Sequence, residues 1–154
     1  MLILLPGNDD PAFADAIADE FGYRSIHTDV IRDPVTGLLS DSLTVDHIAE
    51  ELKKNSGGTV LSAYPHSAIQ AQSLDNALAQ RRLAISIAVA RQGCLEHQDR
   101  HLRGLYRYYR TQNKLYIAER DAAVDKICKA VMQIYLRRRS PAISAEDRDI
   151  VDKD

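Results

Sequence analysis

Residues 1–22, MLILLPGNDDPAFADAIADEFG, decide the fold class of this 154-residue chain. Leu2–Leu5 is an unbroken aliphatic run that ends at a Pro-Gly pair, which is typical of a buried parallel strand. Asp10 is a preferred helix N-cap, Pro11 suits the first helical position, and apolar residues then recur at helical spacing up to a closing glycine. The stretch therefore predicts a strand, a tight turn and an amphipathic helix.

The same alternation of strand and helix patterns continues along the chain. The sequence predicts further strands at 24–27, 59–63, 83–89 and 114–118, and further helices at 40–55, 65–80, 91–113 and 122–136. Strands that alternate with helices indicate a parallel sheet. We expect an α/β protein with three layers, α/β/α, around a central, mostly parallel five-stranded sheet. Residues 1–136 are predicted to form one domain, and 137–154 a polar, flexible tail.

Composition sets bounds on location and partners. A net charge of −2 gives no argument for nucleic acid or an anionic membrane as an obligatory partner. No apolar run approaches the roughly 20 residues that a membrane span needs. Cys94 and Cys128 are far apart in helical patterns, which favours buried, reduced thiols over a disulfide. We therefore expect a cytoplasmic protein.

A parallel sheet binds ligands beyond the carboxyl ends of its strands. The segments expected at those ends are 6–10, 28–32, 62–66, 90–92 and 119–121. Any site should be assembled from them.

Several motifs across most of residues 1–136 resemble those of adenylate kinases and related nucleoside monophosphate kinases. Residues 21–28 resemble that family's Y-G-x-x-x-I-S-T segment, 39–43 its L-V-T-D-E-L helix start, 60–66 its L-L-D-G-F-P-R motif and 108–116 its Y-Y-x-x-x-G-K-L stretch. The resemblance implies a P-loop-kinase-like fold.

The departures from this family concern its chemistry. The phosphate loop G-x-x-x-x-G-K-[ST] is absent, because Gly7 is followed by Asn8, Asp9 and Asp10 without a lysine or second glycine. In 62–66 the magnesium-organising carboxylate and the phosphate-clamping arginine of the family are replaced by serine and histidine. The monophosphate-binding insertion is much shorter, and the fourth strand runs directly into the long helix without a lid. Each change weakens phosphoryl transfer, which depends on positioning and charge stabilisation.

The resemblance leaves a set of candidate nucleotide-binding residues: Gly7, Thr28, Arg32, His66, Gln70, Arg100 and Arg103. Thr28 could hydrogen-bond a phosphate or ribose, Arg32 could pair with an anion, and Gln70 could contact a base edge. His66 could replace the lost arginine only when protonated. The alternative is that these are ordinary polar residues at strand ends. For the first turn, the alternatives are an ordinary capped turn or carboxylates that hold a metal or cationic group.

A basic row is predicted on the long helix. Arg100, Arg103, Arg107, Arg110 and Lys114 are spaced by three and four residues, which places them on one helical face. As a candidate interaction face, this row would suit a partner protein with an acidic surface. The alternative is that the row is an ordinary solvent-exposed helix face. Interleaved tyrosines also suit single-stranded nucleic acid, but the net charge does not.

No metal site or nucleophilic triad is predicted. His97 and His101 are four residues apart on a helical pattern, but no third ligand is evident, and zinc normally needs three or four.

The leading interpretation is a catalytically degenerate nucleoside monophosphate kinase-like protein, a pseudoenzyme. It would serve as a binding or interaction module for a protein partner or a second copy of itself, with residual binding of a nucleotide such as a nucleoside monophosphate and no certain cofactor. The first alternative is an active phosphotransferase whose unconventional phosphate site uses Arg32, Arg100 and Arg103. The second is a small-molecule-binding protein that uses only the former monophosphate pocket.

Overall fold

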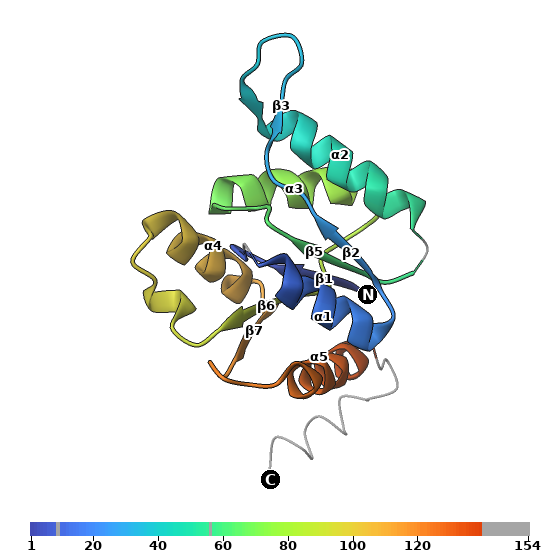
Figure 1. The fold of residues 1–154 in the computed structure, drawn as a ribbon, viewed down its shortest axis with the longest axis vertical. Helices are drawn as coiled ribbons and strands as arrows, with labels where there is room; N and C mark the ends of the chain where they lie inside the picture. The colour runs from blue at the N-terminus through green and yellow to red at the C-terminus, as the bar shows by residue number, and fades with distance from the viewer. Residues whose placement is uncertain (9, 56, 140–154) are drawn as a thin grey trace.

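The computed structural model describes residues 1–8, 10–55 and 57–139 (Figure 1). The strands are β1 (Leu2–Leu5), β2 (Arg24–His27), β3 (Ile31–Arg32), β4 (Leu39–Ser40), β5 (Thr59–Ser62), β6 (Ile87–Arg91) and β7 (Leu115–Ala118). The helices are α1 (Pro11–Phe21), α2 (Asp41–Lys54), α3 (Ala68–Gln80), α4 (Arg100–Thr111) and α5 (Val124–Arg139), with a short 3-10 helix, η1 (Cys94–Glu96).

The central sheet has five strands in the order β2-β5-β1-β6-β7, and every neighbouring pair is parallel. β1 lies in the middle, where Leu4 pairs with Leu61 of β5 and Ala88 of β6. The predicted five-stranded parallel sheet is confirmed.

Helices cover both faces of this sheet (Figure 1). Because side chains alternate along a strand, Leu4 enters a buried cluster with α2, α3 and α4, whereas Ile3 and Leu5 enter a second cluster with α1 and α5. The predicted three-layer α/β/α arrangement is therefore confirmed. Both cysteines are buried and free.

A small antiparallel hairpin, β3-β4, was not predicted as strands. Asp33 builds its turn, since its carboxylate accepts hydrogen bonds from the amides of Val35 and Thr36 at 2.7 and 3.1 Å. Thr44 anchors the hairpin to α2, because its hydroxyl accepts from the Ile31 amide at 2.8 Å and donates to the Ser40 carbonyl at 2.7 Å. The hairpin projects beyond the sheet at the top of Figure 1.

The predicted helix over 91–113 is wrong in its first part. β6 continues to Arg91, two residues beyond the predicted strand end, and it begins only at Ile87. Gly93 then adopts a left-handed φ of +91°, which interrupts any helix at that point. Asp99 caps α4, since its carboxylate accepts from the amides of His101 and Leu102 at 2.8 and 3.4 Å. The strand therefore does not run directly into the helix, and η1 lies between them.

The last helix also differs from the prediction. α5 extends to Arg139, three residues past the predicted end at 136, so the start of the predicted tail is helical. The remainder of that tail, 140–154, lies outside the described residues. In the part of the chain that the structure describes, no helix has both the length and the apolar character needed to cross a membrane.

Candidate functional site

The turn between β1 and α1 is closed by its own hydrogen bonds. Gly7 has a left-handed φ of +69°, and the Asn8 amide donates to the Leu5 carbonyl at 3.2 Å. Asp10 caps α1 as predicted, because its carboxylate accepts from the Ala12 amide at 3.0 Å. Asp9, which the sequence analysis paired with Asp10, lies outside the described residues. The helix N-terminus that would attract an anion thus already holds a carboxylate.

Side chains of α4 fill the space above this turn. A Cβ placed on Gly7 would lie 2.8 Å from Leu102 Cδ2 and 2.9 Å from the Tyr106 hydroxyl. Tyr106 itself is buried. A ligand atom cannot occupy this position beside Gly7 unless these side chains move.

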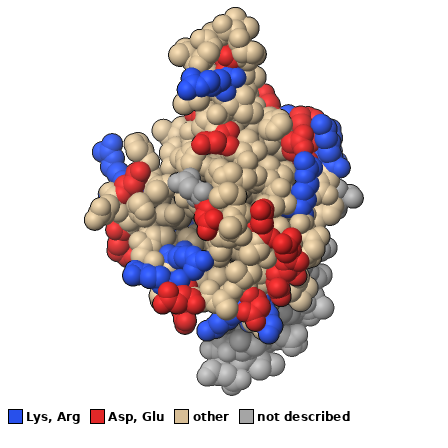
Figure 2. All heavy atoms as spheres, viewed as in Figure 1, with Lys and Arg blue, Asp and Glu red and all other residues tan. Residues whose placement is uncertain are grey.

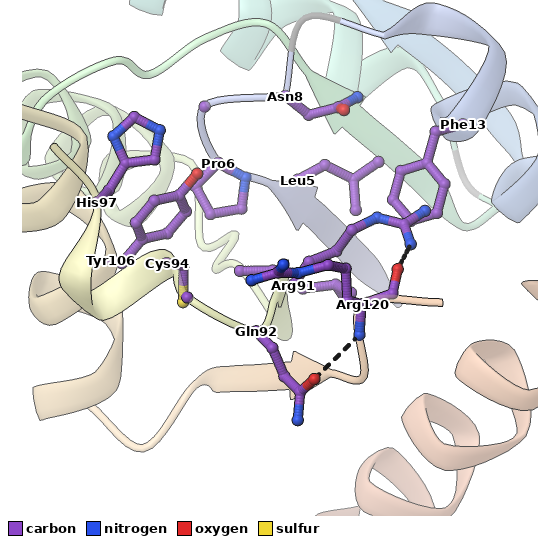
Figure 3. A pocket seen from close by; sticks show the side chains of 14 residues that line it. Leu5, Pro6, Asn8, Phe13, Arg91, Gln92, Cys94, His97, Tyr106 and Arg120 are labelled. Atoms are coloured by element: carbon purple, nitrogen blue, oxygen red, sulfur yellow. Dashed lines mark hydrogen bonds between the residues drawn. The ribbon is translucent and has the colours of Figure 1, made fainter. Parts of the chain in front are cut away.

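A pocket of about 300 Å³ opens beside the turn, and we call it the β1–β6 pocket (Figure 3). The connection from β1 leads to β2 on one side of the sheet, whereas that from β6 leads to β7 on the other. The pocket therefore lies at the topological switch point, where open parallel sheets bind ligands. Its apolar wall contains Leu5, Pro6, Phe13, Val89, Cys94 and Tyr106. Burial raises the pKa of the Cys94 thiol, which disfavours its reactive thiolate form.

Two arginines supply the charge of the β1–β6 pocket. Arg91 is the last residue of β6, and Arg120 follows the end of β7. Because Arg91 pairs in register with Ala118 of β7, the two arginines lie in the same part of the pocket wall. The Arg91 guanidinium lies 4.3 Å from the centre of the Phe13 ring and donates to the Arg120 carbonyl at 2.7 Å (Figure 3). The Arg120 amide donates to the Gln92 side chain at 3.2 Å. Among the described residues, no carboxylate forms an ion pair with either arginine.

A second pocket of about 390 Å³, the α3–α4 pocket, also borders Gly7. Its lining residues are Gly7, His66, Ser67, Gln70, Asp99, His101 and Leu102, so it brings three of the predicted candidates together. The Gln70 side chain is engaged at both ends: its oxygen accepts from the His66 amide at 2.8 Å, and its nitrogen donates to Asp41 at 3.0 Å. This leaves little of the amide free to contact a base edge.

His66 has an acidic neighbour. Its Nε2 lies 3.1 Å from the Asp29 carboxylate. The pKa of Asp29 is lowered, first by a hydrogen bond from the Val30 amide and then by His66. A ligand anion at this position would have to compete with Asp29 for the imidazole.

The other predicted site residues line neither pocket. The Thr28 amide donates to the Ser62 carbonyl at 3.3 Å, beside β5. The Arg32 side chain donates to the Gly37 carbonyl at 2.8 Å within the hairpin, and Arg103 donates to the His97 carbonyl at 2.9 Å. Arg100 is exposed at the start of α4. The predicted candidates are therefore distributed over separate parts of the molecule.

The basic row is shorter than its spacing indicated. Arg100, Arg103, Arg107 and Arg110 lie on α4, but the helix ends at Thr111, and Lys114 follows a left-handed turn at Asn113, where φ is +58°. On the face drawn in Figure 2, positively and negatively charged side chains are interspersed. Among the described residues, no group of three or more His, Cys, Asp or Glu side chains is placed to hold a metal ion.

The arginines of the β1–β6 pocket were not predicted as site residues. Arg91 and Arg120 both fall in segments expected at strand carboxyl ends, 90–92 and 119–121. An arginine at each of two such ends was the available signal. What was missing was the knowledge that β6 and β7 are neighbours.

Comparisons with known proteins support the fold. A de novo designed protein of a P-loop fold, solved by NMR in solution, matches with a TM-score of 0.53 at 9% sequence identity, over 90% of this chain and 94% of that chain. A second de novo design, described as having the P-loop NTPase fold, has a TM-score of 0.49 at 12% identity, over 96% of this chain and 97% of that chain. No protein-family model and no curated protein matches the sequence. The chain thus shares its α/β fold with the first of these designs, and its function must be argued from the site.

Proposed function

We propose that this protein is a binding module on a P-loop NTPase-like fold that does not transfer phosphoryl groups. One observation carries the proposal: the turn after β1 is capped by Asp10 and covered by Leu102 and Tyr106. The proposal retains the interpretation of the sequence as a degenerate nucleoside monophosphate kinase-like protein.

The chemistry of the turn supports this proposal. A phosphate-binding loop offers backbone amides and a lysine to a polyphosphate, and a Ser or Thr hydroxyl to its magnesium ion. Here the Asp10 carboxylate takes an amide of α1, no lysine follows Gly7, and the nearby negative charge repels a phosphate chain. Transfer depends on positioning and charge stabilisation, so a turn without these groups supplies neither.

The contacts of the arginines disfavour the alternative of an active transferase. That alternative needs Arg32, Arg100 and Arg103 to converge on one phosphate. The Arg32 side chain donates a hydrogen bond to a carbonyl of the β3-β4 hairpin, and the Arg103 side chain donates one to a carbonyl in the turn before α4. An unconventional site from these three would require both elements to rearrange.

A coupled assay for ADP formation from ATP and AMP, with and without magnesium, tests the proposal. We expect no rate above that of a protein-free blank, and no saturable heat from ATP in calorimetry. The Asp10→Ser variant is the matched control. Serine retains the helix cap but removes the negative charge, so the variant shows whether the charge at this position affects ATP binding. Turnover by the unaltered protein would refute the proposal.

A concentration series in light scattering tests the accompanying expectation of a homo-oligomer.

A further inference from the structure

We propose that the β1–β6 pocket binds a small organic oxyanion, a phosphomonoester or carboxylate on a flat apolar body, through Arg91 and Arg120. This inference rests on the proposed function, whose ligand class it names. Neither arginine belongs to the set that the family resemblance indicated.

The charge of the pocket is the first argument. The side chains of Arg91 and Arg120 both line the pocket, and no carboxylate of the described residues forms an ion pair with them. An oxyanion bound in the pocket would balance these positive charges and accept charge-assisted hydrogen bonds.

The position of Arg91 is the second argument. Its guanidinium is held on one side by the Phe13 ring, at 4.3 Å, and one of its nitrogens by the Arg120 carbonyl, at 2.7 Å. Arg91 makes five N–H donors available in a rigid planar group, so several remain for a ligand. An arginine that is oriented before binding loses less side-chain entropy when the ligand arrives.

The size and wall of the pocket are the third argument. A volume of about 300 Å³ is at the small end of the range for ligand sites. The side chains of Pro6, Phe13 and Tyr106 offer flat or apolar surface to the body of the ligand (Figure 3). Leu102 Cδ2 and the Tyr106 hydroxyl lie close to Gly7 and limit the pocket on that side. A compact anion with one ring fits these limits.

Calorimetric titration with phenyl phosphate, benzoate and the neutral benzamide tests the proposal on the full chain. We expect saturable binding of phenyl phosphate, benzoate or both, weakened by added salt, and much weaker binding of benzamide. The tighter of the two anions identifies the source of the oxyanion as a phosphomonoester or a carboxylate. Absence of saturable binding by both anions, or equal binding of benzamide, would overturn the proposal.

Substitutions locate the binding. Arg120→Gln and Arg91→Gln should each raise the dissociation constant about tenfold, the usual effect of removing a charge-assisted hydrogen bond. Arg107→Gln is the control, because it removes the same charge from an exposed position on α4 outside the pocket. An equal effect of Arg107→Gln would contradict the proposal. Thermal unfolding identifies any variant that fails to fold. If Arg91→Gln fails because it loses the contact with Phe13, the affinity of Arg120→Gln decides whether the pocket binds the anion.

The two proposals fail separately. Formation of ADP in the coupled assay would refute the proposed function whatever the anions do. Absence of anion binding, with no ADP formed, would overturn only the inference about the β1–β6 pocket.

Discussion

Replacing Gly7 by alanine tests how closely α4 covers the first turn. Gly7 has a φ of +69°, a conformation that costs a residue with a Cβ about 1–2 kcal/mol. The new methyl group would also lie 2.8 Å from Leu102 Cδ2 and 2.9 Å from the Tyr106 hydroxyl. Overpacking of this kind costs about 1–3 kcal/mol. Gly7→Ala should therefore reduce the free energy of unfolding by roughly 2–5 kcal/mol.

Gly22 provides a matched control. Its φ is +71°, nearly that of Gly7, but nothing lies within 4 Å of a Cβ placed there. Gly22→Ala should thus lose only about 1–2 kcal/mol, so the difference between the two variants isolates the packing of α4 on the turn.

Urea unfolding followed by circular dichroism measures the free energy of unfolding of both variants, and thermal unfolding measures their Tm. In a chain of this size each kcal/mol corresponds to about 2–4 °C in Tm, so Gly7→Ala should lower Tm by roughly 4–20 °C. A Leu102→Ala change should offset part of the penalty, which a double-mutant cycle would record as a favourable coupling energy. If Gly7→Ala and Gly22→Ala prove equally stable, the turn is not covered and the reasoning fails.

Two further predictions concern partly buried hydrogen bonds. Thr44→Val should destabilise the protein by about 1–3 kcal/mol and speed hydrogen exchange at the Ile31 amide, which loses its acceptor, whereas Thr111→Val on the exposed face of α4 should do neither. Tyr108→Phe removes the 2.7 Å hydrogen bond to Asp75. Burial raises the pKa of Asp75 and the Tyr108 hydroxyl lowers it, so the variant should raise that pKa further. A raised carboxyl pKa means that stability is lost as pH rises through it, so urea melts should show a larger loss at pH ~7.5 than at pH ~4; an equal loss would contradict this.

The features that local chemistry determines could be predicted from the sequence. The strand at Leu2–Leu5, the Asp10 cap and the helix after it follow from an aliphatic run, a cap preference and a proline. Two of the errors arose where tertiary or single-residue effects dominate. Helical periodicity persists through the region of Gly93 and Asp99, although one residue adopts a left-handed conformation and the other begins a new helix. The strands β3 and β4 have only two residues each, too few for any period to appear.

The candidate site was predicted less well for a related reason. The carboxyl ends of the strands could be named in advance, but which ends are adjacent depends on the strand order. Arg91 and Arg120 meet only because β6 and β7 are neighbours in a particular register. The packing of Leu102 against Gly7 joins residues 95 positions apart, and no local pattern indicates it. Resemblance to a kinase directed attention to Arg32 and Gln70, whose side chains instead bind other parts of this chain.

The closed first turn is tested most directly by NMR titration of the ¹⁵N-labelled protein with magnesium-ATP. If Asp10, Leu102 and Tyr106 occupy the turn, the amide resonances of Gly7, Asn8 and Ala12 should not move as the nucleotide is added to millimolar concentration. A saturable shift of these amides at micromolar concentration would place a polyphosphate on the turn and contradict the account.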